Sequence, residues 1–152
     1  MTKIFITGLS GVGKSSVLNH LKEKGYPTFD LDYGYIIQQD GEPFIDEEKV
    51  FALINNQNYS HLLLAGTESN QGVFYNHVDY IILLEAPLET MLERIETRTT
   101  NPYGKEKRER EAIIHHYYDV LPLLRRRATL TIDTSVHSIE AVSNQIEQLL
   151  KK

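Results

Sequence analysis

Gly8-Leu9-Ser10-Gly11-Val12-Gly13-Lys14-Ser15 is the stretch of sequence that decides the fold of this chain. It fits the pattern G-x-x-x-x-G-K-[ST], in which a glycine-rich loop between a strand and a helix holds the phosphates of a nucleoside triphosphate. The flanking residues agree with this setting. Residues 3–7 are mostly apolar and predict a short strand, and residues 16–24 predict an amphipathic helix that stops at Gly25. The order strand, glycine loop, helix is the one that phosphate binding requires.

The residues of this loop have separate chemical roles. Its glycines carry no Cβ and adopt positive φ readily, so the backbone can approach an anion and point several N–H groups into one concavity. The start of the following helix adds partial positive charge. We expect the Lys14 ammonium to reach the β- and γ-phosphates, and the Ser15 hydroxyl to ligate Mg²⁺. An ordinary strand-to-helix turn is the structural alternative. The residues predicted to hold the nucleotide here are Gly8, Ser10, Gly11, Val12, Gly13, Lys14, Ser15 and Ser16.

The composition is that of a single domain and excludes several classes of site. The chain has 152 residues, the length of one domain, with 41% hydrophobic and 24% charged residues. It has no cysteine, which excludes disulfides, thiolate metal sites and cysteine nucleophiles within it. No apolar run reaches the roughly 18–20 residues of a membrane span, and a strand is predicted from residue 3, so we expect no signal peptide and a cytoplasmic location. The net charge of −5 disfavours nucleic acid as a partner.

Residues 26–32 predict a second strand, which ends in two carboxylates, Asp30 and Asp32. On an extended segment, side chains two residues apart leave the same face. In an open parallel sheet, ligands bind beyond the carboxyl ends of the strands, which is where both aspartates fall. A strand-end turn or a helix N-cap is the structural alternative. We therefore predict that Asp32, and less firmly Asp30, belongs to the functional site.

The remainder of the sequence alternates between strands and helices. Apolar runs predict three further strands, at residues 61–65, 78–85 and 129–134. Helices are predicted at residues 33–39 (short, before a turn at 40–43), 46–54, 88–98 and 111–121, and from the Ser138 cap to about 150. Five strands alternating with helices indicate an α/β fold with a parallel sheet covered on both faces, in a single domain of residues 1–152.

Three polar segments are candidates for ligand contact. In the loop 66–72, Thr67 or Glu68 could order the water shell of a metal, although a plain surface loop explains them equally well. Residues 99–110 contain few apolar side chains, one proline and one glycine, so we expect little to hold them against the core. They predict a lid over the phosphates or, alternatively, a solvated loop followed by the charged first turn of a helix. Arg94 and Arg98 lie four apart on the helix leading into this segment, and we expect nucleotide contacts from them rather than a merely exposed pair.

Two clusters near the end of the chain have simpler explanations. Arg125-Arg126-Arg127 can complement a helix dipole, or one of them can bind a phosphate or carboxylate of the substrate. His115 and His116 are adjacent on a predicted helix and therefore point in different directions, so we predict no zinc site.

Over its whole length the sequence resembles the P-loop small-molecule kinases, most closely the shikimate kinase and gluconate kinase group, relatives of the nucleoside monophosphate kinases. This resemblance implies a three-layer P-loop NTPase fold, with a five-stranded parallel sheet of order 2-3-1-4-5 and a short lid at about 99–110. It rests on four stretches, which are Gly8 to Ser15, Asp30-Leu31-Asp32, the helix and lid from Arg94 through Lys105, and the ending Pro122-Leu123-Leu124 with Ile132-Asp133-Thr134.

The resemblance also implies roles for single residues. Lys14 and Ser15 match the phosphate and magnesium residues of these kinases, and Asp32 matches the aspartate that orients or deprotonates an acceptor hydroxyl close to the metal. Arg94 falls where the family places an arginine against adenine, with Asp133-Thr134-Ser135 as the opposite wall. The lid could use Arg98, Lys105 or Arg108, which no match to the family separates, and Arg98 is the one that we expect to act in catalysis. The implied function is ATP-dependent transfer of the γ-phosphoryl group, with Mg²⁺, to a small metabolite or nucleoside-like acceptor.

The sequence departs from shikimate kinase where that enzyme binds its substrate. The run of three glycines after its third strand is replaced by Gly66-Thr67-Glu68, its lid arginine aligns with Asn101, and its later substrate arginine falls near Val120. Because a carboxylate-bearing substrate needs arginines for bidentate recognition, shikimate is not the expected acceptor. The alternative function is a regulatory nucleotide-binding protein or an NTP-hydrolysing switch without an acceptor. The oligomeric state is left open.

Overall fold

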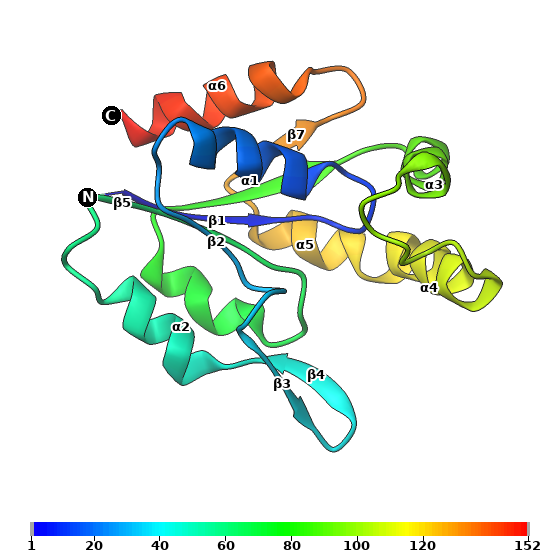
Figure 1. Ribbon diagram of the computed structural model, residues 1–152, viewed down its shortest axis with the longest axis horizontal. Helices are drawn as coiled ribbons and strands as arrows, with labels where there is room; N and C mark the ends of the chain where they lie inside the picture. Colours follow the sequence, from blue (N-terminus) through cyan, green and yellow to red (C-terminus); the bar gives the residue numbers. More distant parts are fainter. Residues whose placement is uncertain (1, 152) are drawn as a thin grey trace.

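A five-stranded parallel sheet forms the centre of the computed structural model, which describes residues 2–151 (Figure 1). All of its strand pairs are parallel, so the carboxyl ends of the strands share one edge. The strands are β1 (Thr2–Thr7), β2 (Thr28–Asp30), β5 (His61–Ala65), β6 (Tyr80–Glu85) and β7 (Leu130–Asp133), in the spatial order β2-β5-β1-β6-β7. Counted along the chain, this is the predicted order 2-3-1-4-5. Because β1 lies in the middle of the sheet, between β5 and β6, the loop that follows it lies at the centre of the edge formed by the carboxyl ends.

Helices cover both faces of the sheet. In Figure 1, α1 (Lys14–Glu23) and α6 (Ile139–Leu150) lie on one face, and α2 (Glu47–Ile54) and the 3₁₀ helix η1 (Gln71–His77) lie on the other. The helices α3 (Leu88–Thr97) and α4 (Lys107–Asp119) stand near the carboxyl ends of the strands, and α5 (Leu121–Arg127) follows α4. Ser138 caps α6 as predicted, because its Oγ accepts from the N–H of Ala141 at 3.1 Å.

Alternate residues of the central strands belong to two separate cores. Ile4 and Ile6 of β1 pack with the apolar residues of α1 and α6, whereas Phe5 between them packs with those of α2 and η1. In β5, Leu62 and Leu64 join the core of Phe5, and the residues between and after them join the other. These side chains are at most 1% exposed. The continuous apolar runs of the sequence are thus required, since neither face of the sheet meets water.

The predicted short helix at 33–39 is wrong. Residues there form a β-hairpin, in which β3 (Ile36–Gln39) pairs antiparallel with β4 (Glu42–Ile45). The two residues of the turn, Asp40 and Gly41, have φ of 54° and 78°. Positive φ at both central positions is the geometry that an Asp-Gly pair favours in a two-residue hairpin, because it matches the twist of the strands. Two further predictions differ from the structure. The helix α4 begins at Lys107 instead of residue 111, and η1 begins at Gln71, inside the loop predicted at 66–72.

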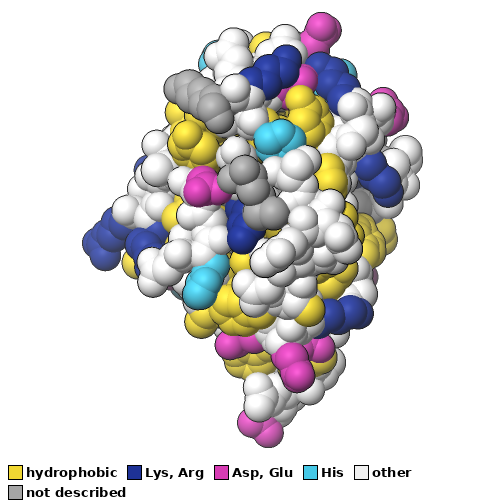
Figure 2. Space-filling model, turned by 90° about the vertical axis from the view of Figure 1, so that its left-hand side faces the viewer, with side chains coloured by type: hydrophobic (Ala, Val, Ile, Leu, Met, Phe, Trp, Pro, Cys, Tyr) yellow, Lys and Arg dark blue, Asp and Glu magenta, His cyan; other side chains and the backbone are white. Residues whose placement is uncertain are grey.

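The surface at the amino ends of the strands carries mixed charge (Figure 2). On this face, lysine and arginine side chains stand apart from one another among acidic, histidine and hydrophobic side chains. Among residues 2–151, no helix has both the length and the hydropathy needed to cross a membrane.

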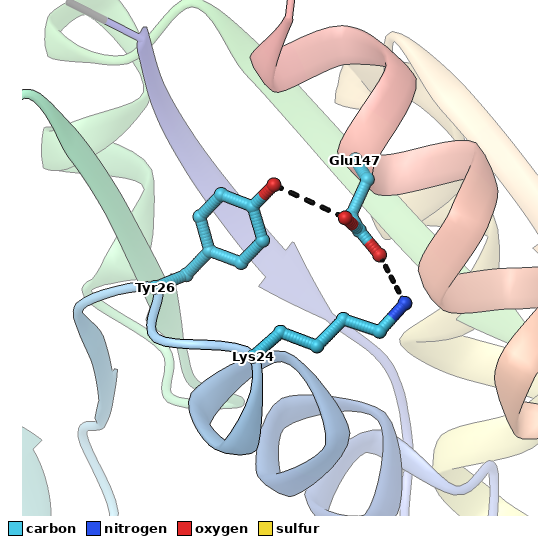
Figure 3. Close-up of polar contacts among 3 residues, drawn as sticks. All are labelled: Lys24, Tyr26 and Glu147. Atoms are coloured by element: carbon cyan, nitrogen blue, oxygen red, sulfur yellow. Dashed lines mark hydrogen bonds and ion pairs between the residues drawn. The ribbon is translucent and has the colours of Figure 1, made fainter.

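A polar cluster ties the end of α1 to α6 (Figure 3). The Lys24 ammonium lies 2.5 Å from Glu147 Oε1, and the Tyr26 hydroxyl donates to Glu147 Oε2 at 3.1 Å. The hydrogen bond from Lys24 holds the pKa of Glu147 below its ordinary value, and the same bond raises the pKa of Lys24. Because α1 begins in the glycine loop, this cluster anchors the far end of the helix that carries Lys14.

Replacing Glu147 by Gln should lower the Tm at pH 7 by about 2–4 °C, since the amide keeps the shape but loses the charge that pairs with Lys24. The folded-state pKa of Glu147 lies below its unfolded value, so the contribution is present above the unfolded pKa of about 4.3 and is lost as pH falls through the folded pKa. Thermal denaturation from pH 7 to pH 3 measures this difference, which should shrink in acid. The control is Glu96→Gln, because exposed Glu96 makes no side-chain hydrogen bond or ion pair among residues 2–151. A Tm gap between wild type and E147Q that is constant with pH would contradict the ion pair.

Candidate functional site

The glycine loop passes through a narrow space between β6 and α3. A Cβ atom on Gly8 would lie 2.5 Å from the carbonyl oxygen of Leu84, and one on Gly11 would lie 2.7 Å from that of Met91. Gly11 also has φ of 87°, which side chains disfavour. The protein's own backbone therefore requires glycine at both positions, independently of any ligand.

Lys14 is the first residue of α1, and its ammonium is held over the loop. The Nζ atom donates to the carbonyl oxygen of Gly8 at 3.2 Å and to the hydroxyl of Thr67. Burial lowers the pKa of Lys14, and the carboxylates of Asp32, Asp30 and Glu68 oppose that shift in this order. The lysine is thus a partly buried cation with two neutral oxygen partners, which phosphate oxygens can replace.

The loop that carries Thr67, one of the two partners of Lys14, is held in place by Gln71. The sequence did not distinguish this glutamine. Gln71 is 4% exposed, and its Nε2 donates to Thr7 Oγ1 at 2.9 Å and to the Tyr75 hydroxyl at 2.7 Å. Its Oε1 accepts from the N–H of Glu68 at 3.0 Å. These bonds hold the loop after β5 against the end of β1. Nothing in the sequence distinguishes Gln71 from the exposed polar residues around it.

Asp30 and Asp32 both line the cavity, but they do so without sharing an extended strand. The strand β2 ends at Asp30, and the N–H of Asp32 donates to Asp30 Oδ1 at 3.1 Å, as in an Asx turn. The expectation that both side chains leave one face of a strand is therefore wrong. Burial raises the pKa of Asp30, and burial together with the charge of Asp32 raises the pKa of Glu68. Among residues 2–151, none of these three carboxylates forms an ion pair.

Arg94 connects the glycine loop to the loop after β7. Its Nη1 donates to Thr134 Oγ1 at 2.9 Å and to the carbonyl of Gly11 at 3.3 Å, and its Nη2 donates to the carbonyl of Thr134 at 2.9 Å. The Thr134 hydroxyl in turn donates to the carbonyl of Val12 at 2.6 Å. Arg94 consequently reaches both the phosphate loop and the wall that follows the last strand, and its predicted contact with the nucleotide stays a prediction.

Arg98 is engaged with the segment that was predicted as a lid. Its Nε donates to the carbonyl of Asn101 at 3.0 Å and its Nη2 to that of Tyr103 at 2.6 Å, while Lys105 Nζ donates to the carbonyl of Arg98 at 2.6 Å. Gly104 is buried between Ile95 and Ile113. The expectation that little holds this segment against the core is wrong for residues 101–105, because these bonds and this contact fix it to α3 and α4.

One cavity of about 970 Å³ joins these groups. Its walls come from the glycine loop and α1, from β2 and the turn after it, from α3 with the following segment, and from the loop after β7. Such a volume is that of a site for a small molecule or cofactor. Gly8 does not line it and contributes its carbonyl to Lys14 instead. The predicted site residues that line the cavity are Ser10, Gly11, Val12, Gly13, Lys14, Ser15, Ser16, Asp32, Arg94 and Arg98.

The terminal arginines lie outside this cavity. Arg125 Nε is 2.9 Å from Glu85 Oε2, and the Arg127 guanidinium lies 5.1 Å from the centre of the Tyr75 ring. Both therefore support the fold and not the cavity. In the described part of the chain, no group of three histidine, aspartate or glutamate side chains could hold a metal ion. A Mg²⁺ ion at Ser15 would accordingly need oxygens from the nucleotide and water, which is how Mg²⁺ is usually held.

Comparison with known proteins agrees with this geometry. A family model described as "AAA domain" matches residues 4–115. A nucleotide-binding protein of Alcanivorax borkumensis is 31% identical over 97% of this chain and 55% of its own length, and one of Methylobacillus flagellatus is 29% identical over 99% of this chain and 54% of its own length. The chain thus spans about half the length of the curated relatives it matches.

Solved structures share the fold. Shikimate kinase from Acinetobacter baumannii, in complex with shikimate, superposes with a TM-score of 0.71 at 20% identity, covering 99% of this chain and 93% of that one. Shikimate kinase from Bacteroides thetaiotaomicron gives 0.63 at 16% identity, with 99% of each chain covered. At these identities, the likeness concerns the arrangement of the strands and helices.

Replacing Gln71 by Leu should lower the Tm by about 2–10 °C, because the buried Thr7 and Tyr75 hydroxyls lose their partner and an unsatisfied buried group costs about 1–3 kcal/mol. Thermal denaturation of the purified protein measures this. Gln148→Leu is the matched control, because Gln148 is exposed on α6 and should tolerate the same change. Equal Tm values for the two variants would show that the Gln71 bonds do not hold the loop.

Proposed function

The chain belongs to the AAA domain family as a P-loop nucleotide-binding domain, and from this premise we propose that it is an ATP-dependent phosphotransferase for a small acceptor. The observation that carries the proposal is one cavity lined by the glycine loop with Lys14 and, beside them, by Asp30 and Asp32. These two carboxylates form no ion pair among residues 2–151, and the part of the cavity next to them is called its carboxylate end. A triphosphate on the loop would leave the carboxylate end open to a second molecule.

The proposed reaction uses few groups. Lys14 and the N–H groups of the glycine loop hold the β- and γ-phosphates, with Ser15 and Asp32 close to a Mg²⁺ ion that neutralises charge on the phosphate oxygens when bound. Asp32 accepts the proton of the acceptor hydroxyl. The acceptor oxygen then bonds to the γ-phosphorus while the bond from phosphorus to the β–γ bridging oxygen breaks, and ADP leaves with both electrons of that bond.

Two arginines complete the proposed site. Arg94, with Thr134 beside it, forms the wall that adenine would contact. Arg98 stabilises the transferred group after it releases the carbonyls of Asn101 and Tyr103, so its action depends on movement of the segment 99–110. Positioning and charge neutralisation supply most of the catalysis in phosphoryl transfer, which suits a site with one candidate base.

A second candidate function is a regulatory nucleotide-binding protein that hydrolyses a triphosphate without a small acceptor. The observation in its favour is that the matched relatives are named only as nucleotide-binding proteins and are about twice the length of this chain. The two functions differ in one measurement, the stimulation of ADP release by small hydroxyl compounds.

Lys14→Ala should weaken binding of ATP with Mg²⁺ by about 10²-fold, because the variant loses the partly buried cation that faces the phosphates. Calorimetric titration measures the affinity, and the Tm checks that the variant is folded. Lys107→Ala, at an exposed residue outside the cavity, should bind as the wild type does. Unchanged affinity in K14A would remove the basis of the proposed function.

Asp32→Asn should spare ATP binding and lower the rate of transfer by about 10²–10⁴-fold, the usual contribution of a general base. The rate is measured as ADP release in the presence of an accepted substrate. Asp40→Asn at the exposed hairpin turn is the control, because asparagine tolerates the positive φ found there. Equal turnover by D32N and wild type would assign the base to another group.

A further inference from the structure

We propose that the acceptor is an uncharged polyhydroxylated molecule (a polyol, a sugar or a nucleoside) and that charge excludes phosphorylated and carboxylated acceptors. The inference rests on the proposed function and names its substrate class. Its basis is the balance of charges and the kind of surface at the carboxylate end of the cavity.

Two carboxylates line the cavity where transfer would occur, those of Asp30 and Asp32. Glu68 does not line the cavity, but it stands beside Thr67, whose hydroxyl contacts Lys14. Lys14 is the cation that faces all three. A bound triphosphate would take that cation for its own phosphates, and the carboxylates would then face the acceptor. A phosphate or carboxylate next to the reacting hydroxyl would meet like charge, which strongly disfavours binding.

The other cationic side chains that line the cavity donate hydrogen bonds to the protein itself or lie further from the phosphate loop. Arg94 donates to Thr134 and Gly11, and two nitrogens of Arg98 donate to backbone carbonyls of residues 101 and 103. Lys22 lies seven residues beyond Ser15 on α1, which places it about 10 Å further along the helix axis. With Arg94 bound to Thr134 and Arg98 assigned to the transferred phosphoryl group, no further arginine among residues 2–151 lines the cavity to recognise a carboxylate or phosphate of the acceptor bidentately.

The carboxylate end of the cavity can bind the hydroxyl groups of an acceptor and can also cover its sugar or base ring. Asp30 uses Oδ1 for the N–H of Asp32, which leaves Oδ2 and the Asp32 carboxylate able to accept hydrogen bonds and free of ion pairs with side chains of residues 2–151. Hydroxyl donors satisfy carboxylates without adding charge. Tyr33, with 71% of its surface exposed, and Tyr35 line this end of the cavity, and the face of a tyrosine ring can cover a sugar or a base.

Matched pairs of acceptors test the inference. ADP release from ATP with Mg²⁺ is measured with adenosine against AMP, cytidine against CMP, glucose against glucose 6-phosphate, and glycerol against glycerate. We expect the uncharged member of an accepted pair to have kcat/KM about 10²-fold higher than the anionic member. The nucleoside and polyol arms identify which neutral class is used. Calorimetric binding of the same compounds to the protein loaded with a non-hydrolysable ATP analogue gives a readout independent of turnover.

Asp30→Asn tests the cause of the preference. The asparagine keeps the Oδ1 acceptor for the N–H of Asp32 but removes one negative charge, so the ratio of neutral to anionic kcat/KM should fall by about tenfold. Asp40→Asn serves as the control and should leave the ratio unchanged. Equal or better use of the anionic members, or an unaltered ratio in D30N, overturns the inference. So does a protein that binds and phosphorylates anionic members only, whereas loss of the proposed function itself would appear as ADP release that no compound of either kind stimulates, or as failure to bind ATP.

Discussion

The site depends on one constraint, which is that the partly buried ammonium of Lys14 must be surrounded by oxygen atoms. A cation taken out of water needs oxygen partners, and this one has the Gly8 carbonyl, the Thr67 hydroxyl and three carboxylates in its surroundings. Those partners come from the loop after β1, from β2 and from the loop after β5. The one charge therefore explains why three separate strand ends must carry polar groups at the same edge of the sheet.

The sheet delivers these groups to one place because all of its strands run in the same direction. The alternation of Ile4, Phe5 and Ile6 between two cores leaves β1 no freedom to shift its register, since a shift of one residue would exchange the two faces. The glycine loop is consequently held in a fixed position, and the close approach of Gly8 and Gly11 to neighbouring backbone holds it there from the other side. Lys24 and Glu147 complete this support at the far end of α1.

The proposed site has two halves, one that would hold the phosphates and one that would hold the acceptor. The phosphate half is shared with shikimate kinase structures in its fold, and its residues follow from the motif. The proposed acceptor half differs, because Asp30 and Asp32 make it acidic where a carboxylate-binding enzyme needs arginines. The segment 98–105, folded onto α3 and α4 through Arg98 and Gly104, links the two halves, since the same arginine holds the segment and lines the cavity.

The sequence by itself determined the five strands, the phosphate loop and the cap of α6, because apolar runs, glycine spacing and capping residues act over a few neighbouring positions. The order of the strands was implied by the family resemblance, and the sheet confirms it. The tertiary structure alone decided the role of Gln71, the bonds of Arg94 and Arg98 and the positions of Arg125 and Arg127, because each depends on partners distant in the chain. The hairpin at residues 36–45 was predicted in part. Its turn at 40–43 follows from a local Asp-Gly signal, but the strand before the turn was predicted as a helix, because its pairing with β4 decides its conformation.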